Sequence, residues 1–482
     1  MAQHCGYIIK VENLTKHPNA DRLQLLHVFG TTTTVGLDVK VGDMGIYFPT
    51  DLQLSIEYCV ANHLCRKNPL DGTADSGYMD GDKRNVTAIK LRGERSDGIY
   101  VPLSSLEAFG DISKLKVGDT IDTFNGHLIC EKYIPRSNKH ADSRSTDGKG
   151  KTAKRKDPIA PLFTEHADTS QLAYNLNAFK PGDEIEITLK MHGTSQRTAY
   201  VPVLKGYKRS FWDRLFRRPG KPIYEYGYVS GTRRTILNDY EGGFYGSNAF
   251  RKQHADQFED KLWKGETVYY EVVGFTDTGA PIMGDCQNKK LNDKDFVKQY
   301  GDITRFSYGC YPIADEVLYE KEEDGFYSFK KPKPQSDLYV YRMTMTNEDG
   351  DVVEYTPDFM RYRCEMMGVK CVPVFAKGTL SETHDGLPYI DYRNMVMNAN
   401  SGASATTLGE TVQYVAELFY DGPDPIGKSH VREGVVVRIL NRPKFTAYKH
   451  KNFSFKCLSG IAIAELEAQG IDNIDADILA EL

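Results

Sequence analysis

Lys190-Met191-His192-Gly193-Thr194-Ser195 is the stretch that decides how this chain is interpreted. It follows the alternating apolar run Ile185-Glu186-Ile187-Thr188-Leu189, so a strand is expected to end at the lysine and a small-residue turn to follow. A lysine amine attacks only when deprotonated, and a rigid, partly desolvated site near other cations favours that form. Gly193 would let the backbone approach a phosphate closely. The stretch is a candidate lysine nucleophile, although such a lysine is also common on ordinary surfaces.

The composition bounds the class of protein. A length of 482 residues suggests two or three domains, and the net charge of −5 argues against a wholly basic nucleic-acid coat protein. Nine scattered cysteines without a CxxC pair indicate neither a zinc site nor a disulfide framework, which favours a reducing compartment. Without a secretory signal or an apolar run of membrane-spanning length, we expect a soluble cytoplasmic protein.

The chain divides at residues 136–157, where apolar residues are almost absent and Ser, Gly, Lys and Arg dominate. This composition predicts a basic flexible linker, whose cations either contact phosphates or are simply solvated. Upstream, residues 1–135 contain short apolar runs separated by Gly, Pro, Asn and Asp, which predicts a small β-barrel.

Two segments of this first part resemble the OB-fold tRNA-binding domains appended to aminoacyl-tRNA synthetases. They are His17-Pro18-Asn19-Ala20-Asp21-Arg22-Leu23 and Leu91-Arg92-Gly93-Glu94-Arg95-Ser96-Asp97-Gly98-Ile99. The resemblance implies an OB-fold that binds nucleic acid on a curved face. The alternative is that these residues only shape turns.

Residues 158–482 carry five further motifs in the order found in covalent nucleotidyltransferases, the superfamily of DNA ligases, RNA ligases and capping enzymes. The motifs are Val229-Ser230-Gly231-Thr232-Arg233-Arg234, Val268-Tyr269-Tyr270-Glu271-Val272-Val273-Gly274, Leu338-Tyr339-Val340-Tyr341-Arg342-Met343, Arg432-Glu433-Gly434-Val435-Val436-Val437-Arg438 and Ala447-Tyr448-Lys449-His450-Lys451-Asn452. The chain as a whole is thus identified as an α+β protein, an N-terminal OB-fold β-barrel followed by a nucleotidyltransferase domain of ATP-grasp-like antiparallel sheets.

The resemblance implies a role for one or two residues of each motif. Arg233 would reach sugar or phosphate, and Glu271 would take a ribose hydroxyl or position the lysine and the metal. Glu433 would be a metal ligand beside the triphosphate. Tyr341 would stack on the nucleobase, with Tyr339 as a second candidate and core packing as the alternative.

Lys449 and Lys451 alternate along a predicted strand, so both are expected on one face. Two cations there suit an α-phosphate in transfer and would depress the nucleophile's pKa by like-charge repulsion. In ordinary proteins, the same pattern is usually solvated surface.

His192 distinguishes branches within the superfamily. The pattern Lys190-Met191-His192-Gly193-Thr194 is similar to phage RNA ligases that seal duplex nicks and to the RNA-editing ligases of kinetoplastids, as is Phe163-Thr164-Glu165-His166-Ala167-Asp168-Thr169 upstream. An N-terminal OB domain before the catalytic domain resembles the Deinococcus-type RNA ligases instead. Leu189 stands where the editing branch has glutamate, and Ser195 where it has asparagine. Leu189, Gly193 and Thr194 are nevertheless expected at the nucleotide.

These resemblances imply an ATP-dependent RNA ligase that uses Mg²⁺ or Mn²⁺ and passes through lysyl-AMP and adenylylated RNA. Lys190 would take the AMP, and His192 would serve the later steps unless it is a buried structural histidine. RNA ends or nicks, such as a broken tRNA, are the expected partners in RNA repair, with no obligate protein partner. The alternatives are a DNA ligase, a capping-type guanylyltransferase and a non-catalytic RNA-binding protein.

A basic segment with interleaved aromatic residues, 205–221, lies between the first two motifs. It would either hold phosphates while its rings stack on bases, or form an amphipathic helix that packs Phe211, Leu215 and Phe216 on the domain.

Overall fold

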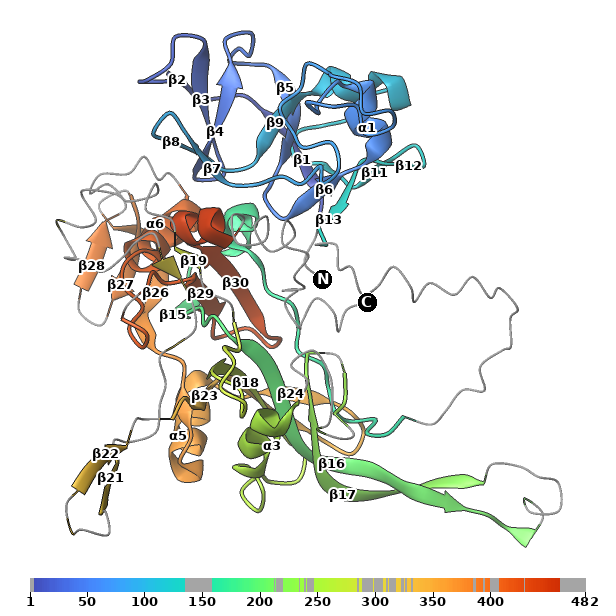
Figure 1. The fold of residues 1–482 in the computed structure, drawn as a ribbon, viewed down its shortest axis with the longest axis vertical. Helices are drawn as coiled ribbons and strands as arrows, with labels where there is room; N and C mark the ends of the chain where they lie inside the picture. The colour runs from blue at the N-terminus through green and yellow to red at the C-terminus, as the bar shows by residue number, and fades with distance from the viewer. Residues whose placement is uncertain are drawn as a thin grey trace.

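A computed structural model describes residues 4–134, 158–211, 213, 220–233, 235–237, 240, 247–283, 286–287, 298, 307–308, 311, 318–321, 325, 327–330, 333–384, 387–392, 395–398, 407–428 and 430–459. The predicted linker 136–157 lies outside these residues. The chain stacks three layers along its long axis: an N-terminal unit, a seven-stranded sheet and a six-stranded sheet (Figure 1).

The N-terminal unit is rich in short strands, as its alternating sequence predicts. A four-stranded sheet has the order β10-β1-β5-β9, and a three-stranded sheet has the order β2-β3-β4. Their bounds are β1 Gly6–Lys10, β2 Leu14–Lys16, β3 Leu23–Val28, β4 Thr31–Gly36, β5 Met44–Phe48, β9 Ile99–Pro102 and β10 Thr120–Ile121. The inward side chains, among them Ile8, Ile46 and Phe48, form one buried core with helix α1, Ile56–Ala61.

The closed barrel expected for residues 1–135 is not found among the described residues. The remaining strands make three separate pairs rather than joining the two sheets. They are β6 Leu52–Leu54 with β13 Cys130–Lys132, β7 Ile89–Leu91 with β8 Glu94–Ser96, and β11 Thr123–Phe124 with β12 His127–Leu128. Periodicity predicts which residues form strands, but the pairing of strand edges far apart in sequence leaves no local pattern.

The middle layer is a seven-stranded sheet of order β14-β30-β29-β15-β26-β27-β28. Its bounds are β14 Ser170–Gln171, β15 Glu184–Leu189, β26 Val374–His384, β27 Leu387–Tyr392, β28 Met395–Asn398, β29 Gly434–Ile439 and β30 Thr446–Lys451. Helix α6, Leu408–Tyr420, packs Val412, Val415 and Ala416 on this sheet. The short helices η2, Leu172–Tyr174, and η3, Leu176–Ala178, adjoin it.

The third layer is a six-stranded sheet of order β17-β16-β18-β23-β24, with β25 paired to β23. Its bounds are β16 Thr194–Lys208, β17 Lys221–Gly231, β18 Glu266–Gly274, β23 Ser336–Thr346, β24 Val352–Glu354 and β25 Lys370–Cys371. Helices α3, Ala249–Asp256, and α5, Pro357–Met367, cover the face that buries Tyr270, Val272 and Val340.

The remaining elements include η1, Leu103–Phe109, which packs Leu106 and Phe109 into the core of the N-terminal unit. Two further strand pairs are β19 Cys286–Gln287 with β20 Ser307–Tyr308 and β21 Leu318–Lys321 with β22 Tyr327–Lys330. All seven cysteines that the structure describes in full are free thiols, in agreement with the predicted lack of a disulfide framework. In the described part of the chain, every helix is too short or too polar to cross a bilayer.

The chain crosses between the two large sheets at residues 190–193. Strand β15 ends at Leu189 in the middle layer, and β16 begins at Thr194 in the third. An ion pair between side chains also joins the layers, since Arg361 of α5 pairs with Glu186 of β15 at 2.9 Å. Lys190 to Gly193 therefore lie where two rigid sheets meet.

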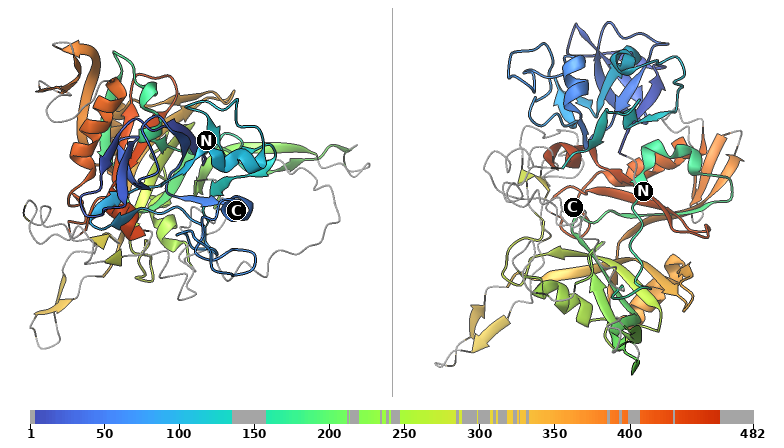
Figure 2. Two further views of the ribbon diagram at one scale, coloured as in Figure 1. Left: turned by 90° about the horizontal axis from the view of Figure 1, so that it is seen from above. Right: turned by 90° about the vertical axis from the view of Figure 1, so that its right-hand side faces the viewer.

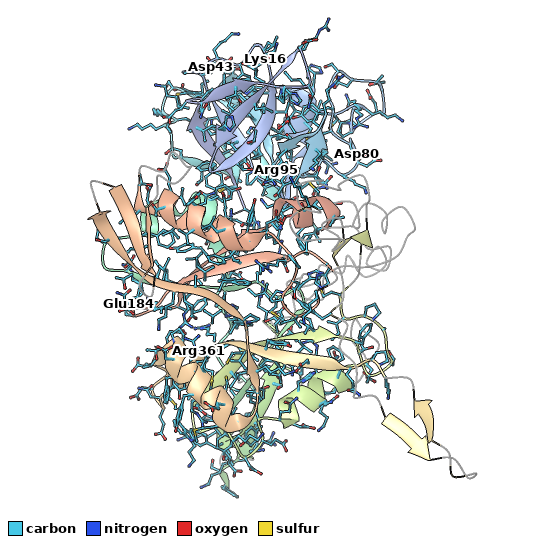
Figure 3. The ribbon with its side chains drawn as sticks, turned by 90° about the vertical axis from the view of Figure 1, so that its left-hand side faces the viewer. Lys16, Asp43, Asp80, Arg95, Glu184 and Arg361 are labelled. Carbon is cyan, nitrogen blue, oxygen red and sulfur yellow. The ribbon has the colours of Figure 1, made fainter. Side chains whose placement is uncertain are left out.

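The N-terminal unit packs directly on the middle layer. Tyr7 stacks on Tyr174 with ring centroids 4.5 Å apart, and Lys456 pairs with the buried Asp97 at 2.6 Å. Arg95 lies 5.2 Å from the ring of Phe453, and Figure 3 shows it on the side of the unit that faces the sheet. The contact covers strand β30, which carries two of the candidate site residues (Figure 2).

Candidate functional site

Lys190 is held at the crossing by its backbone and by one carboxylate. Its backbone N–H donates to the carbonyl of Gly434 at 3.0 Å, which ties the turn to the start of β29. Its Nζ lies 2.5 Å from Oε1 of Glu433, and the side chain is 23% exposed. The amine is thus positioned and partly desolvated, as the sequence predicts for this lysine.

Glu433 is the centre of the cluster. Its second oxygen, Oε2, lies 3.3 Å from Nδ1 of His192, and Oε1 lies 3.9 Å from Nζ of Lys451. Burial by itself raises the pKa of Glu433, but Lys190, His192 and Lys451 outweigh it and hold the pKa far below its usual value. The carboxylate therefore stays ionised, and it contacts three basic side chains that come from two other motifs.

Gly434 allows this approach. The strand-entry residue has a positive φ of 152°, and a Cβ there would lie 2.1 Å from the carbonyl oxygen of His450. Any side chain would push β29 and β30 apart at the point where Glu433 leaves the sheet. The Glu433-Gly434 pair of the sequence is therefore a geometric requirement of the cluster.

Lys449 and Lys451 lie on β30, antiparallel to β29, with Lys449 opposite Val436 and Lys451 opposite Gly434. Burial, together with the charges of Lys451 and Lys190, lowers the pKa of Lys449 to about 8. Lys449 and Lys451 thus lie on one strand, as predicted. Of these two lysines, it is Lys449 whose pKa the neighbouring lysines lower.

Two residues that no sequence motif indicates, Tyr311 and Asp424, hold the backbone of His192 in place. Its backbone N–H donates to the hydroxyl of Tyr311 at 3.4 Å, and Tyr311 donates to Asp424 at 2.9 Å. Asp424 also accepts from the backbone N–H groups of Ile426 and Gly427. The imidazole is 9% exposed, so burial and a functional role are both compatible with its position.

Gly193 packs tightly against the neighbouring strand, in addition to the approach to a phosphate that the sequence predicts. A Cβ at this residue would lie 2.5 Å from the carbonyl oxygen of Val272 and 2.8 Å from Cγ of Glu271. The glycine thus lets the turn pack on β18, which brings Glu271 next to the crossing. Ser195 pairs with Glu271 across the two strands.

Leu189, Thr194 and Tyr339 have partners within the protein. Leu189 is 2% exposed and belongs to a buried cluster with Tyr339, which is 8% exposed. The hydroxyl of Thr194 accepts from Nη2 of the buried Arg251 at 2.6 Å. For Tyr339 this corresponds to the core-packing alternative.

Tyr341 lies in an aromatic cluster that we define by His166, Tyr269, Tyr341 and Phe445. The ring of His166 is 5.0 Å from Tyr341 and 5.5 Å from both Tyr269 and Phe445. The hydroxyl of Tyr341 lies 3.0 Å from Oγ of Ser195 on β16. Burial and the guanidinium of Arg342 lower the pKa of His166 well below its usual value, so its ring is neutral.

Arg233 follows β17 and pairs with Asp168 at 3.2 Å, within the segment 163–169. Its neighbour Thr232 accepts from Nε of Arg197 through its carbonyl oxygen at 2.9 Å. Arg197, on β16, also donates to the carbonyls of Phe163 and Thr164. The segment 163–169 was singled out by its resemblance to other ligases, but none of these contacts could be predicted from the sequence.

The N-terminal unit contributes one charge to the cluster. Oδ2 of Asp51 lies 3.9 Å from Nζ of Lys451. The side chain of Asp51 is 62% exposed, and the charges of Lys451, Lys449 and Lys456 lower its pKa. Asp51 occupies a turn with φ of 72°, a left-handed conformation that aspartate tolerates. No local pattern predicts a contact across 400 residues, so this residue was missed.

The carboxylates fit a magnesium or manganese ion that is shared with a substrate. Among the described residues, no three His, Cys, Asp or Glu side chains form a preassembled metal cage. Mg²⁺ commonly takes one or two carboxylates and completes its shell with water and phosphate oxygens. Glu433, which contacts Lys190, and Glu271, which packs against Gly193, are carboxylates of that kind.

No family model and no curated protein matches the sequence. Solved structures of an RNA ligase from Naegleria gruberi resemble the whole chain. The form with PPi has a TM-score of 0.48 at 15% identity over 97% of this chain and 99% of that chain. A variant with ATP and Mn has a TM-score of 0.49 at 15% identity over 94% and 98%. Likeness of this size does not fix an activity, so we infer the function from the geometry above.

Proposed function

We propose that the protein is an ATP-dependent RNA ligase that joins a 3′-hydroxyl to a 5′-phosphate through lysyl-AMP and adenylylated RNA. The observation that carries the proposal is the contact of Glu433 with Lys190, His192 and Lys451. Motifs separated by more than 240 residues converge on one carboxylate. A solvated strand-end lysine would have no need of such a cluster.

In the first step, the deprotonated Nζ of Lys190 attacks the α-phosphorus of ATP. A nitrogen–phosphorus bond forms, the bond to the bridging oxygen breaks, and pyrophosphate leaves. Lys449 and Lys451 stabilise the charge that builds on the phosphate oxygens. Glu433 accepts hydrogen bonds from Lys190 and so aims its amine at the phosphate.

Glu433 and Glu271 are the residues that would hold Mg²⁺ or Mn²⁺. The ion, when bound, neutralises phosphate charge and favours the free amine of the nucleophile. Glu271 is also placed, beside Gly193, to accept a ribose hydroxyl. Arg233 would contact sugar or phosphate after release from Asp168.

The nucleobase would stack on Tyr341 at the aromatic cluster. The neutral ring of His166 and the hydroxyl of Ser195 give this place both acceptors and donors. Leu189 and Thr194 support the turn around Lys190, and backbone groups at Gly193 remain candidates for the nucleotide contact. The choice of ATP over GTP rests on the family resemblance.

In the second step, AMP passes from Lys190 to the RNA 5′-phosphate. In the third, the RNA 3′-hydroxyl attacks that phosphate and AMP leaves. His192 is our candidate for these later steps, because it shares Glu433 with the nucleophile. The N-terminal unit, as an OB-like nucleic-acid-binding domain in the Deinococcus-type order, would hold the RNA beside β30. Nick sealing or RNA repair in the cytoplasm is the proposed setting.

Covalent labelling tests the first step. The protein is incubated with α-labelled ATP or GTP and Mg²⁺ or Mn²⁺, after treatment with pyrophosphate to remove any resident AMP, and is then denatured and separated. We expect label from ATP in the wild type and in Lys180→Ala, an exposed lysine also close to a glycine turn, and none in Lys190→Ala. Label only from GTP would indicate capping chemistry, and no label would favour the binding-protein alternative.

Strand joining tests the rest. Nicked duplexes that differ only in RNA or DNA around the nick are incubated with the labelled protein. Joining confined to RNA supports the proposal, and joining confined to DNA would make the protein a DNA ligase.

A further inference from the structure

The β16–β17 hairpin extends well beyond the sheet to which it belongs. Figure 1 shows its two strands leaving the body of the molecule, and the view from above in Figure 2 shows the same projection. The inner part of β16 pairs with β18 only from Thr194 to Ala199, whereas its pairing with β17 continues to Lys208. We call the part beyond Val203, residues 204–224, the arm.

The sequence of the arm concentrates positive charge in a chain whose net charge is −5. Residues 205–223 contain seven Lys or Arg and a single Asp. Lys205, Lys208, Arg209 and Lys221 are exposed, and so are the rings of Tyr207 at 41% and Phe211 at 74%. Residues 205–208 belong to β16 and Lys221 begins β17, whereas Phe211 and Asp213 have helical backbone. Leu215 and Phe216, which the alternative helix would pack on the domain, lie outside the described residues.

The pairing register makes this charge costly. Lys208 lies directly opposite Lys221 across the two strands. Directly opposed side chains of like charge destabilise a strand pair. Within the described part of the chain, no carboxylate forms an ion pair with Lys205, Lys208 or Lys221. A bound polyanion would remove this repulsion, and a protein that needed only a longer sheet would gain nothing from it.

The inner ends of both hairpin strands lie next to candidate site residues in the sequence. Strand β16 begins four residues after Lys190, and β17 ends two residues before Arg233. The 14 steps from Thr194 to Lys208, at about 3.3 Å each, place Lys208 about 45 Å from the turn that follows the nucleophile. Successive phosphates on one strand are about 3.4 Å apart along the axis of a DNA duplex and closer together in A-form RNA, so this reach spans at least roughly a dozen base pairs.

We propose that the arm binds the phosphate backbone of the RNA substrate roughly a dozen base pairs from the end being joined. The inference deepens the proposed function and rests on it. Lys205, Lys208, Arg209 and Lys221 contact phosphates, and the exposed rings of Tyr207 and Phe211 lie against sugars or unpaired bases. The arm thereby favours long or structured RNA over short fragments.

The test compares the triple variant Lys205→Gln/Lys208→Gln/Lys221→Gln with a matched triple Lys→Arg variant that keeps the charges. Each binds a non-ligatable nicked RNA duplex with about 20 base pairs on either side of the nick, or about 8, over a series of salt concentrations. We expect the Gln variant to lose at least tenfold in affinity for the long duplex, and the log–log salt dependence to flatten by about 3. The Arg variant should keep both, and binding of the short duplex should be unchanged.

Two readouts separate this inference from the proposed function. Labelling of Lys190 by ATP needs no RNA, so it should be equal in all three proteins and it reports that the site is folded. If wild-type labelling fails while the Gln variant still loses affinity for long RNA, the ligase proposal fails and the arm stands. If the Gln variant bound the long duplex as tightly as the wild type, or lost the same affinity for both lengths, the proposal that the arm binds distant RNA would be contradicted.

Discussion

At the scale of single residues, Glu433 determines what the lysines can do. It is the carboxylate on which Lys190, His192 and Lys451 converge, and its ionised state is held by those same cations. Lys449 stands beside this cluster, where burial and the charges of Lys451 and Lys190 lower its pKa to about 8. The cluster is therefore asymmetric: Lys190 and Lys451 contact the carboxylate of Glu433, and Lys449 is held near its titration point.

Replacing Lys449 by Met should stabilise the fold while impairing lysine adenylylation. The pKa of Lys449 is lowered from 10.5 to about 8, so at neutral pH the folded protein holds a charge that the unfolded chain holds at less cost. We expect a gain of about 1–3 kcal/mol in the free energy of unfolding at pH 7, at about 1.4 kcal/mol for each pKa unit and less after solvent screening.

The contribution of Lys449 to the free energy of unfolding depends on pH. The folded protein releases the proton near pH 8 and the unfolded chain near 10.5, so wild-type stability from this group rises across that window. The advantage of the Met variant, measured by chemical denaturation, should be largest below pH 8 and vanish near pH 10.5. An advantage that grew with pH would contradict the account.

Replacing His192 by Asn should separate the steps of the reaction. Lys190 keeps Glu433, so labelling by ATP should change by only a few fold, whereas sealing of a nicked RNA should fall by about a hundredfold. Single-turnover transfer from preformed lysyl-AMP to RNA measures this. A parallel loss in both steps would assign His192 to the structure of the cluster alone.

The site residues that could be predicted from the sequence are those that lie within a recognisable motif. Lys190, Glu433, Lys449 and Lys451 could be chosen because they lie in short motifs whose order along the chain resembles that of covalent nucleotidyltransferases. Asp51 could not be predicted in this way, because its partner is 400 residues away. Tyr311 and Asp424 could not be predicted either, because the Tyr311 hydroxyl contacts the backbone N–H of His192, a group that every residue except proline carries.

At the scale of elements, the crossing from β15 to β16 is the feature that positions the nucleophile. Three of the strands around it were predicted: alternating apolar residues mark β15, and nearly continuous apolar runs mark β18 and β29. What could not be predicted is that Gly193 faces backbone of β18 instead of open space. The length of the β16–β17 hairpin was also hidden, because its charged outer half resembles a solvated loop.

Gly193→Ala should therefore disturb the crossing far more than a glycine substitution elsewhere on the same strand. The added Cβ would lie 2.5 Å from the carbonyl of Val272, and backbone cannot move as a flexible side chain would. We expect a loss of about 1–3 kcal/mol in stability, with much weaker labelling of Lys190.

Gly206→Ala is the matched control, since a Cβ there meets nothing within 4 Å. It should leave labelling unchanged and alter the free energy of unfolding by less than about 1 kcal/mol. Equal effects of the two substitutions would remove the special role of the crossing.

At the scale of the whole molecule, the N-terminal unit is part of the candidate site's surroundings. It packs on the middle sheet through Tyr7, Asp97 and Arg95, and places Asp51 beside Lys451. Its short strands were predicted, and its closed barrel was not found, because strand-edge pairing is a property of the assembled unit. The interface could not be anticipated from either unit alone.

Asp51→Asn should tighten the binding of ATP. Removing a negative charge 3.9 Å from Lys451 leaves the lysine cluster more positive toward a triphosphate, and at such distances in a solvated setting a charge is worth about 1 kcal/mol. We expect the KM for ATP in lysine adenylylation to fall about threefold to fivefold. Asp71→Asn, in an exposed turn of the same unit, should have no effect. A KM that rises would mean that Asp51 helps to hold the nucleotide or its metal.

The most direct test of the central claim is to find the residue that carries the AMP. The protein is charged with ATP and the metal, digested, and its modified peptide is sequenced by mass spectrometry, with and without a chase of nicked RNA. The account predicts a single adenylylated residue, Lys190, and its discharge on addition of RNA. Modification of Lys449 or Lys451 instead, or an adduct on Lys190 that RNA does not remove, would contradict it.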